Sequence, residues 1–336
     1  MTQIIVLDEA YVGLTALMTV GIQLAGYFVA YCFQIDKITD FLGSMNYVAN
    51  VLVALFLGGR LDARQIYLST AVVIARLYLG LYLLYRVVKR GHDGRFDGFR
   101  DKPLPFLGFW VFQMIWVWCN TLPIVMVNST QRDVPLNAWD GVGIALIAIG
   151  LFYEVVGDQQ KQAWKSSRSK DAVLCDVGLW GHTRHPNYFG EICIWLGMFL
   201  ACVPVILQEA GWWWIGLLCP VTTIVILLFL GGLPTAEGSA LKAFYKDSHK
   251  RQVWEAYKRR TSILFPFPPA LYAAMPMWLK RAICLEWKLY EYTPEDEESS
   301  ETLSPGASNS DRQQRAYGAT AQSAKVSAQA DAGEWK

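Results

Sequence analysis

Apolar residues fill roughly seven long stretches of the chain, and charged residues are almost confined to the segments between them. A helix that crosses a bilayer needs about 20 mostly apolar residues. The stretches that meet this requirement have approximate limits 10–33, 41–59, 66–88, 104–127, 138–157, 188–208 and 211–232. The pattern therefore predicts an all-α fold, a polytopic transmembrane helical bundle with about seven spans.

The composition supports a membrane protein. Of the 336 residues, 53% are hydrophobic and only 18% are charged, which is too apolar for an ordinary soluble domain. The formal net charge of +1 provides no general attraction to nucleic acid. The seven cysteines include no C-x-x-C pair, and His182 and His185 have no third ligand near them in the sequence. We therefore expect contact with membrane lipids, no nucleic-acid partner, no disulfide framework and no metal site.

The basic residues predict the orientation of the chain, because loops that stay in the cytoplasm retain lysine and arginine. They gather in the segments 89–102, 161–184 and 242–260, which follow the third, fifth and seventh spans. With seven spans, all three segments fall on one side of the membrane. We therefore expect the N-terminus to be lumenal or outside and the C-terminus to be cytosolic.

The end of the chain differs in composition from the rest. Residues 293–336 are rich in Glu, Ser, Gln, Ala and Gly and cannot bury a core, so we expect a disordered tail. The preceding residues 277–292 mix bulky apolar and basic side chains, which is typical of a segment that lies along the membrane surface.

Four charged residues follow one another at helical spacing where the fifth span ends. Glu154, Asp158, Lys161 and Lys165 are spaced by four, three and four, so they share one face of the helix that leaves the membrane. One interpretation is an ion-paired helix end whose long side chains reach toward water. The other is a binding surface, with carboxylates for hydroxyl or amide groups and lysines for phosphate. Because a carboxylate inside a span is costly, Glu154 favours the binding surface.

A second concentration of polar residues lies in the run GLWGHTRHPNYFGE, residues 178–191. Proline fits the first turn of a helix, so we expect a new helix to begin near Pro186. The free N–H groups of that helix end would lie beside Arg184 and His185, which suits a diphosphate or a carboxylate. The first turn would also present the side chains of Asn187, Tyr188 and Glu191. An ordinary interfacial helix start with an aromatic anchor is the alternative interpretation.

After the last span, residues 234–261 combine aromatic and basic side chains, among them Tyr245 and Tyr257. A helix of this makeup can cap a cytosolic pocket, with aromatic rings stacking on an adenine and basic groups meeting phosphate. It is equally typical of a basic amphipathic helix that rests on anionic lipid.

The run GLWGHTRHPNYFGEICIWLG, residues 178–197, resembles the signature of the membrane family related to the C-terminal domain of steroid 5-alpha-reductases. Its largely uncharacterised branch also resembles the segments ARLYLGLYLLYRVVKRGHDGRFD (75–97), FWVFQMIWVW (109–118) and FYEVVGDQQKQAWK (152–165). The similarity covers roughly residues 10–270. Sterol reductases and, more distantly, isoprenylcysteine and phospholipid methyltransferases share the R-H-P-x-Y core.

This resemblance implies an enzyme of the endoplasmic reticulum that binds NADPH from the cytosolic side and reduces a carbon–carbon double bond in a lipid or sterol-like substrate. Residues 1–135 would form the substrate cavity and residues 136–292 a cofactor-binding transmembrane domain. Matched by position, the cofactor-binding residues would be Glu154, Asp158, Lys161, Lys165, Arg184, His185, Asn187, Tyr188, Glu191, Tyr245 and Tyr257.

The catalytic residues are less clearly matched. The steroid reductases polarise their substrate with a Glu and a Tyr from the N-terminal half, and neither has a clear counterpart here. The polar residues of the corresponding region, each of which could equally pair helices, are Arg76, Arg86, Asp93, Arg95 and Gln113. We expect catalysis to depend on Tyr188, Glu191 and Arg76.

Two alternatives to reduction remain. S-adenosylmethionine also needs an anion-binding helix start and an adenine pocket, so the R-H-P-N-Y run is compatible with a lipid or isoprenylcysteine-type methyltransferase. The methyltransferases commonly carry two adjacent acids after their final span, whereas Glu237 stands alone. A non-catalytic lipid-binding or scaffold protein is the second alternative, because the substrate-polarising pair is missing.

Overall fold

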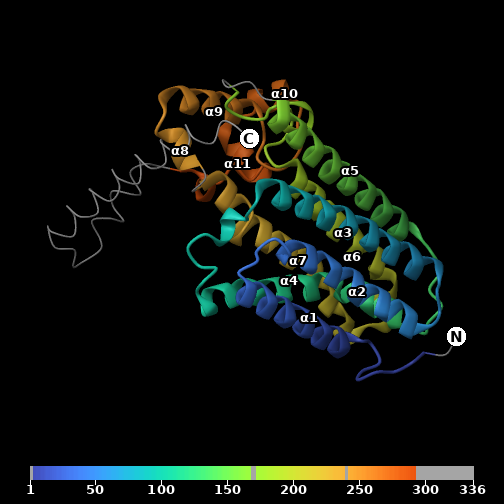
Figure 1. Cartoon of the computed structure of the whole chain (residues 1–336). Helices are drawn as coiled ribbons and strands as arrows, with labels where there is room; N and C mark the ends of the chain where they lie inside the picture. Colours follow the sequence, from blue (N-terminus) through green and yellow to red (C-terminus); the bar gives the residue numbers. More distant parts are fainter. Residues whose placement is uncertain (1–2, 168–171, 239–240, 293–336) are drawn as a thin grey trace, which may run out of the picture.

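The computed structural model describes residues 3–167, 172–238 and 241–292, and these residues form a helical bundle with a small helical cap at one end (Figure 1). The first six long helices are α1 (Val12–Phe33), α2 (Thr39–Gly58), α3 (Ala63–Arg90), α4 (Pro103–Ser129), α5 (Ala138–Ser167) and α6 (Pro186–Glu209). A seventh, less regular span runs over Gly211–Gly238 and contains α7 (Leu218–Val225). The cap contains α8 (Lys242–Tyr245), α9 (Ser248–Arg260), α10 (Pro269–Ala274) and α11 (Met277–Ile283).

The predicted all-α polytopic bundle is confirmed. Seven helices in the described ranges are long and apolar enough to cross a membrane. Large apolar side chains such as Leu17, Phe56 and Ile115 are exposed on the outside of the bundle, where lipid would cover them. The chain is therefore an integral, multi-pass membrane protein. The tail predicted for residues 293–336 lies outside the described residues.

Helix boundaries follow the local sequence signals. The sixth helix begins at Pro186, as predicted, because proline has no N–H to lose in the first turn of a helix. The fifth helix continues about three turns past the predicted limit of 157 and ends at Ser167, so it carries the whole charged stripe from Glu154 to Lys165. The four charged side chains on this face of α5 therefore lie at successive depths along the helix.

The basic segments share one end of the bundle. Helices α3 and α5 end, and α4 and α6 begin, at the end where α8 to α11 gather, and the N-terminus lies at the opposite end (Figure 1). This arrangement agrees with the grouping of the basic loops predicted from the sequence. That this end faces the cytosol stays a prediction.

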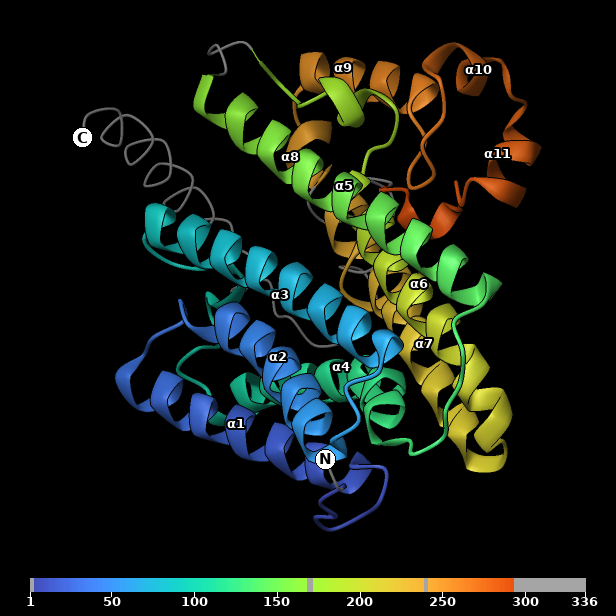
Figure 2. The same cartoon turned by 90° about the vertical axis from the view of Figure 1, so that its right-hand side faces the viewer.

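The closest helix packing joins α5 and α6, which run side by side (Figure 2). Glycines separated by seven residues form the contact, Gly143 and Gly150 on α5 against Gly197 and Gly190 on α6. A Cβ atom added at Gly150 would lie 2.5 Å from the carbonyl oxygen of Gly190, closer than real Cβ contacts. Small residues let backbones approach in this way inside membranes. The seam places the charged stripe of α5 directly beside the first turns of α6.

The N-terminal helices are joined by hydrogen-bonded amides in their interior. The side chain of Gln113 donates to Gln23 at 3.0 Å, and Gln23 donates to Asn46 at 3.1 Å. Asn50 donates to Thr19 at 2.8 Å. Side-chain hydrogen bonds of this kind hold helices together where lipid offers no competing partner. Gln113, a candidate polar residue of the sequence, therefore connects α4 to α1.

The glycine seam can be tested by substitution. We expect Gly150→Ala to lower the free energy of unfolding by about 1–3 kcal/mol, because the new methyl group overlaps the α6 backbone. Gly141→Ala is the matched control, since a Cβ at Gly141 meets nothing within 4 Å. The control should be neutral or slightly stabilising because alanine is the better helix former. Thermal unfolding of the detergent-solubilised variants measures both, and equal effects would contradict the close packing.

Candidate functional site

Three predicted site residues meet inside the bundle and form what we call the intramembrane charge cluster: Arg76, Glu154 and Glu191. Two nitrogens of Arg76 donate to the two carboxylate oxygens of Glu191 at 3.0 and 2.7 Å, and both side chains are buried. The guanidinium also faces the rings of Tyr47 and Trp195, with centroids 5.4 and 5.2 Å away. Trp195 donates its indole N–H to Glu191 at 2.8 Å. These contacts fix the ion pair in a single geometry.

Two atoms of this cluster have no hydrogen-bond partner among the described residues. They are Oε2 of Glu154, whose side chain is 2% exposed, and Nε of Arg76. A buried polar atom without a partner costs about 1–3 kcal/mol. The cluster also carries two carboxyl groups and only one guanidinium. Glu154 therefore has an oxygen, and Arg76 an N–H group, that is free to bind a ligand. Both lie inside a membrane span, where unpaired polar groups favour a functional interpretation.

A second group lies nearer the cap, and we call it the boundary cluster: Asp158, Lys161, Asn187 and Tyr188. The Lys161 ammonium lies 3.9 Å from the centroid of the Trp180 ring and forms no ion pair within the described residues. Asp158 is buried and faces the charges of Arg86 and Lys161. Trp180 is itself held by hydrogen bonds to Gly157 and from Tyr257. The boundary cluster thus presents a cation and a carboxylate on a rigid support.

Tyr188 and Asn187 complete the boundary cluster from the first turn of α6. The Tyr188 ring stacks on the imidazole of His185, with centroids 5.0 Å apart and an interplanar angle of 9°. Neither the Tyr188 hydroxyl nor the Asn187 amide has a hydrogen-bond partner in the described part of the chain. Lys165 lies one turn beyond Lys161 and is exposed.

Arg184 and His185 of the R-H-P-N-Y run belong to a separate group of buried ion pairs, completed by Glu237 and Glu286, that we call the cap network. Arg184 donates to Glu237 at 2.8 Å and to Glu286 at 2.9 and 3.1 Å, and it also donates to the Thr261 carbonyl. Four of its five N–H groups are therefore used. Its backbone N–H donates to the Ser262 carbonyl at 2.8 Å. The loop before Pro186 is thereby fixed to the cap.

His185 is part of the same network. Its Nε2 lies 2.8 Å from a carboxylate oxygen of Glu237. Burial lowers the pKa of His185, so the neutral ring donates its Nε2 proton to this carboxylate. Because the His185 ring also stacks on Tyr188, it helps to orient this residue of the boundary cluster.

The sequence predicted Arg184, Tyr245 and Tyr257 as cofactor ligands, and the structure engages all three within the protein. Arg184 is neutralised by two carboxylates because a buried guanidinium is costly without counter-charges. The Tyr257 hydroxyl donates to the Trp180 carbonyl, and the Tyr245 hydroxyl donates to Glu255 at 2.7 Å. Arg184 and Tyr257 connect the cap to the loop before α6, and the Tyr245 bond joins α8 to α9 within the cap.

Two other polar candidates also have structural partners. Asp93 and Arg95 pair with each other, and Arg95 also pairs with Asp40 in α2. They therefore join the α3–α4 loop to the start of α2.

Some residues of the site were not predicted from the sequence. Glu286 is 102 positions away from its partner Arg184, and nothing in the spacing of either residue indicates this pairing. Trp195 lies four residues after Glu191 and thus on the same helix face, a signal that could have identified it. Among the described residues, no group of three or more His, Cys, Asp or Glu side chains is arranged to hold a metal ion.

Comparison with known proteins identifies the family. A family model described as "Protein of unknown function (DUF1295)" matches residues 26–261. The chain belongs to the DUF1295 family. No curated protein and no solved structure matches the chain. The region matched to the DUF1295 family contains the intramembrane charge cluster and the boundary cluster, and it ends before Glu286.

The central ion pair of this DUF1295 chain can be tested by a double-mutant cycle. Arg76→Met should lower the free energy of unfolding by about 3–5 kcal/mol, because it leaves a buried carboxylate without its counter-charge. Adding Glu191→Gln should recover part of that loss, since the uncompensated charge is removed. Equilibrium unfolding in mixed micelles measures the coupling between the two changes. Strictly additive losses would show that the two side chains do not interact in the folded protein.

Proposed function

We propose that this protein is a membrane-embedded, NADPH-dependent reductase of a carbon–carbon double bond in a lipid or steroid-like substrate. The observation that carries the proposal is the pair of buried, unpartnered atoms at Glu154 and Arg76, which lie below the boundary cluster. Buried polar atoms without a partner are costly inside a membrane span, and they favour a functional interpretation of the cluster. The resemblance of residues 178–197 to the steroid-reductase signature points to the same chemistry.

The boundary cluster fits the polar parts of a dinucleotide. Lys161 offers a cation without an ion-pair partner in the described residues, which suits a phosphate. Asp158 and Asn187 suit ribose hydroxyl and amide groups, and Lys165 stands at the water end of the same stripe. We no longer include Arg184, Tyr245 and Tyr257 among the proposed NADPH ligands, because each already binds another group of the protein. When bound, NADPH supplies a hydride to one carbon of the double bond.

The other carbon requires a proton, and we assign its delivery to Glu154. Arg76 and Glu191 neutralise each other, so a neutral Glu154 leaves the cluster without net charge in a low-dielectric interior. Its open Oε2 can then carry the proton that the reaction consumes. The open N–H of Arg76 can donate to an oxygen of the substrate and stabilise the negative charge that develops there. Glu191 thus becomes a positioning residue that orients Arg76.

The surroundings support such a site. The glycine seam brings the backbone of Gly190 against Glu154, and the rings of Tyr47 and Trp195 flank Arg76. Close packing of this kind excludes water, and water exclusion strengthens charged contacts within the site. We further propose that the end with the cap faces the cytosol, the source of NADPH, in the endoplasmic reticulum membrane.

Ligand-dependent thermal stability tests the proposal. NADPH should raise the melting temperature of the purified protein in detergent, whereas S-adenosylmethionine should not. Lys161→Met should weaken NADPH binding about tenfold or more, because a desolvated charge-assisted contact is worth about 1.5–3 kcal/mol. Lys89→Met is the matched control, since Lys89 is an exposed lysine near the same end of the bundle.

Two other results would redirect the interpretation. Stabilisation by S-adenosylmethionine alone would support a methyltransferase. Stabilisation by neither compound, in a sample with normal helical content, would support a non-catalytic lipid-binding or scaffold role. Glu154→Gln separates binding from chemistry, because it should retain NADPH affinity within about twofold and lose turnover.

A further inference from the structure

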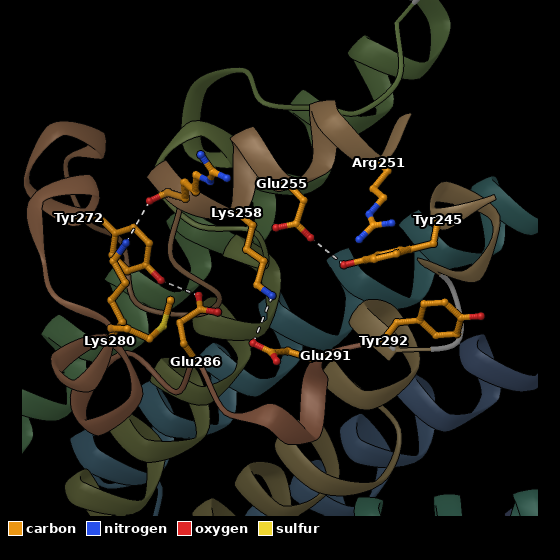
Figure 3. Close-up of a pocket in the computed structure, with 11 residues that line it drawn as sticks. Tyr245, Arg251, Glu255, Lys258, Tyr272, Lys280, Glu286, Glu291 and Tyr292 are labelled. Atoms are coloured by element: carbon orange, nitrogen blue, oxygen red, sulfur yellow. Dashed lines mark hydrogen bonds and ion pairs between the residues drawn. The ribbon is translucent and has the colours of Figure 1, made fainter. Parts of the chain in front are cut away.

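The cap contains a pocket that the proposed reductase chemistry does not use. It has a volume of about 450 Å³ and lies between α8, α9, α10 and α11 and the segment that follows them (Figure 3). We call it the cap pocket, and its lining includes Arg251, Lys258, Arg259, Lys280 and Tyr272. Positive groups therefore enter it from both α9 and α11.

The carboxylates of the cap pocket are already engaged. Glu286 accepts from Tyr272 at 2.6 Å and pairs outside the pocket with Arg184, which it shares with Glu237. Glu255 accepts from the Tyr245 hydroxyl, and Glu291 lies 3.4 Å from the Lys258 ammonium (Figure 3). Three acids thus line the pocket with four cations. The pocket has an excess of positive charge.

Lys280 is the strongest indication of a missing ligand. Its side chain is 6% exposed, yet within the described residues it has no carboxylate within 4 Å. The ammonium donates to the Arg259 carbonyl at 3.1 Å and lies 4.2 Å from the centroid of the Tyr272 ring. Burial lowers the pKa of Lys280, although the nearby Glu286 carboxylate acts in the opposite direction. An anion in the pocket would further compensate the charge of Lys280.

Two further cations line the pocket without ion pairs in the described part of the chain. The Arg259 side chain is exposed and lines the pocket. The Arg251 guanidinium lies 5.2 Å from the centroid of the Tyr245 ring. The opposite edge of Tyr245 packs against Tyr292, with centroids 5.2 Å apart. Tyr245 is thus covered by its neighbours and is a poor platform for stacking a nucleotide base.

The apolar surroundings favour a lipid as the source of the anion. Met277 lines the pocket, and its neighbour Trp278 is 69% exposed. Leu271 and Ile283 are also exposed on α10 and α11. Exposed apolar side chains next to basic groups are typical of segments that rest on an anionic membrane surface. An acyl chain could lie on this surface while its headgroup enters the pocket.

We propose that the cap pocket binds the phosphate-bearing headgroup of an anionic membrane lipid, with the phosphate held by Lys280 and Arg259. The site is separate from the intramembrane charge cluster and does not depend on the reductase proposal. Its ligand would connect α9 to α11 and fix the cap on the membrane surface.

Native mass spectrometry of the full chain in detergent tests this proposal with short-chain lipids. Dioctanoyl phosphatidic acid should bind at least tenfold more tightly than dioctanoyl phosphatidylcholine. Lys280→Met and Arg259→Gln should each weaken phosphatidic acid binding about fivefold or more. Arg259 is exposed, so its replacement leaves the fold intact even if the buried Lys280 variant is unstable. Lys250→Gln is the control, because Lys250 lies on the same helix outside the pocket and should bind as the native chain does.

Three outcomes would overturn the proposal. The first is equal binding of the two lipids, and the second is unchanged binding in the folded Arg259→Gln protein. The third is displacement of phosphatidic acid by equimolar inorganic phosphate or NADPH, which would make the site one for soluble phosphates. Because NADPH stabilisation is measured separately with Lys161→Met, failure here leaves the reductase proposal untouched.

Discussion

The bidentate ion pair between Arg76 and Glu191 is the constraint on which the arrangement of the bundle depends. It joins α3 to α6 inside the membrane, where a lone charge would be expelled, so neither helix can rotate or slide without leaving a charge unpaired. The glycine seam then holds α5 against α6 and places Glu154 beside the pair. Glu154 is thus a third ionisable group next to a neutral ion pair, and its Oε2 has no hydrogen-bond partner among the described residues. The ion pair and the close glycine packing together explain how a polar cluster is stable in an apolar interior.

Helix α5 carries the charged groups of the site at successive depths in the membrane. Glu154 lies in the interior, Asp158 and Lys161 lie one and two turns higher, and Lys165 reaches the exposed end of the helix. The same end carries the cap network, in which Arg184 is held by Glu237 and Glu286. Glu237 comes from a π-helical turn, Pro234–Gly238, and such turns are frequent at functional sites. Arg184 therefore fixes the residues just before Pro186 to the cap, which gives α6 a defined start for the boundary cluster.

Much of this organisation can be predicted from the sequence, because it depends on short-range patterns of residues. Apolar stretches predict the spans, proline predicts the start of α6, and spacing by three and four predicts that Glu154, Asp158, Lys161 and Lys165 share a face. The partners of Arg184 could not be predicted, because Glu237 and Glu286 are 53 and 102 positions away and helical periodicity carries no information about contacts at that range. The sequence therefore identified Arg184 as an important residue and assigned it to a phosphate, whereas buried carboxylates hold it. Gly143 and Gly150 are seven residues apart, as are Gly190 and Gly197, and this matching spacing is a signal that a closer inspection of the sequence could have used.

Isotope transfer tests the central claim most directly. Purified protein is incubated with a membrane lipid extract and NADPH that carries deuterium at C4, and the lipids are then examined by mass spectrometry. The account predicts a lipid that gains one deuterium from the cofactor and one hydrogen from solvent, with the gain abolished in Glu154→Gln. An active protein whose Glu154→Gln variant transfers deuterium at the native rate would contradict the role of the buried cluster, and absence of transfer by a folded, NADPH-binding protein to any extracted lipid would contradict reduction itself.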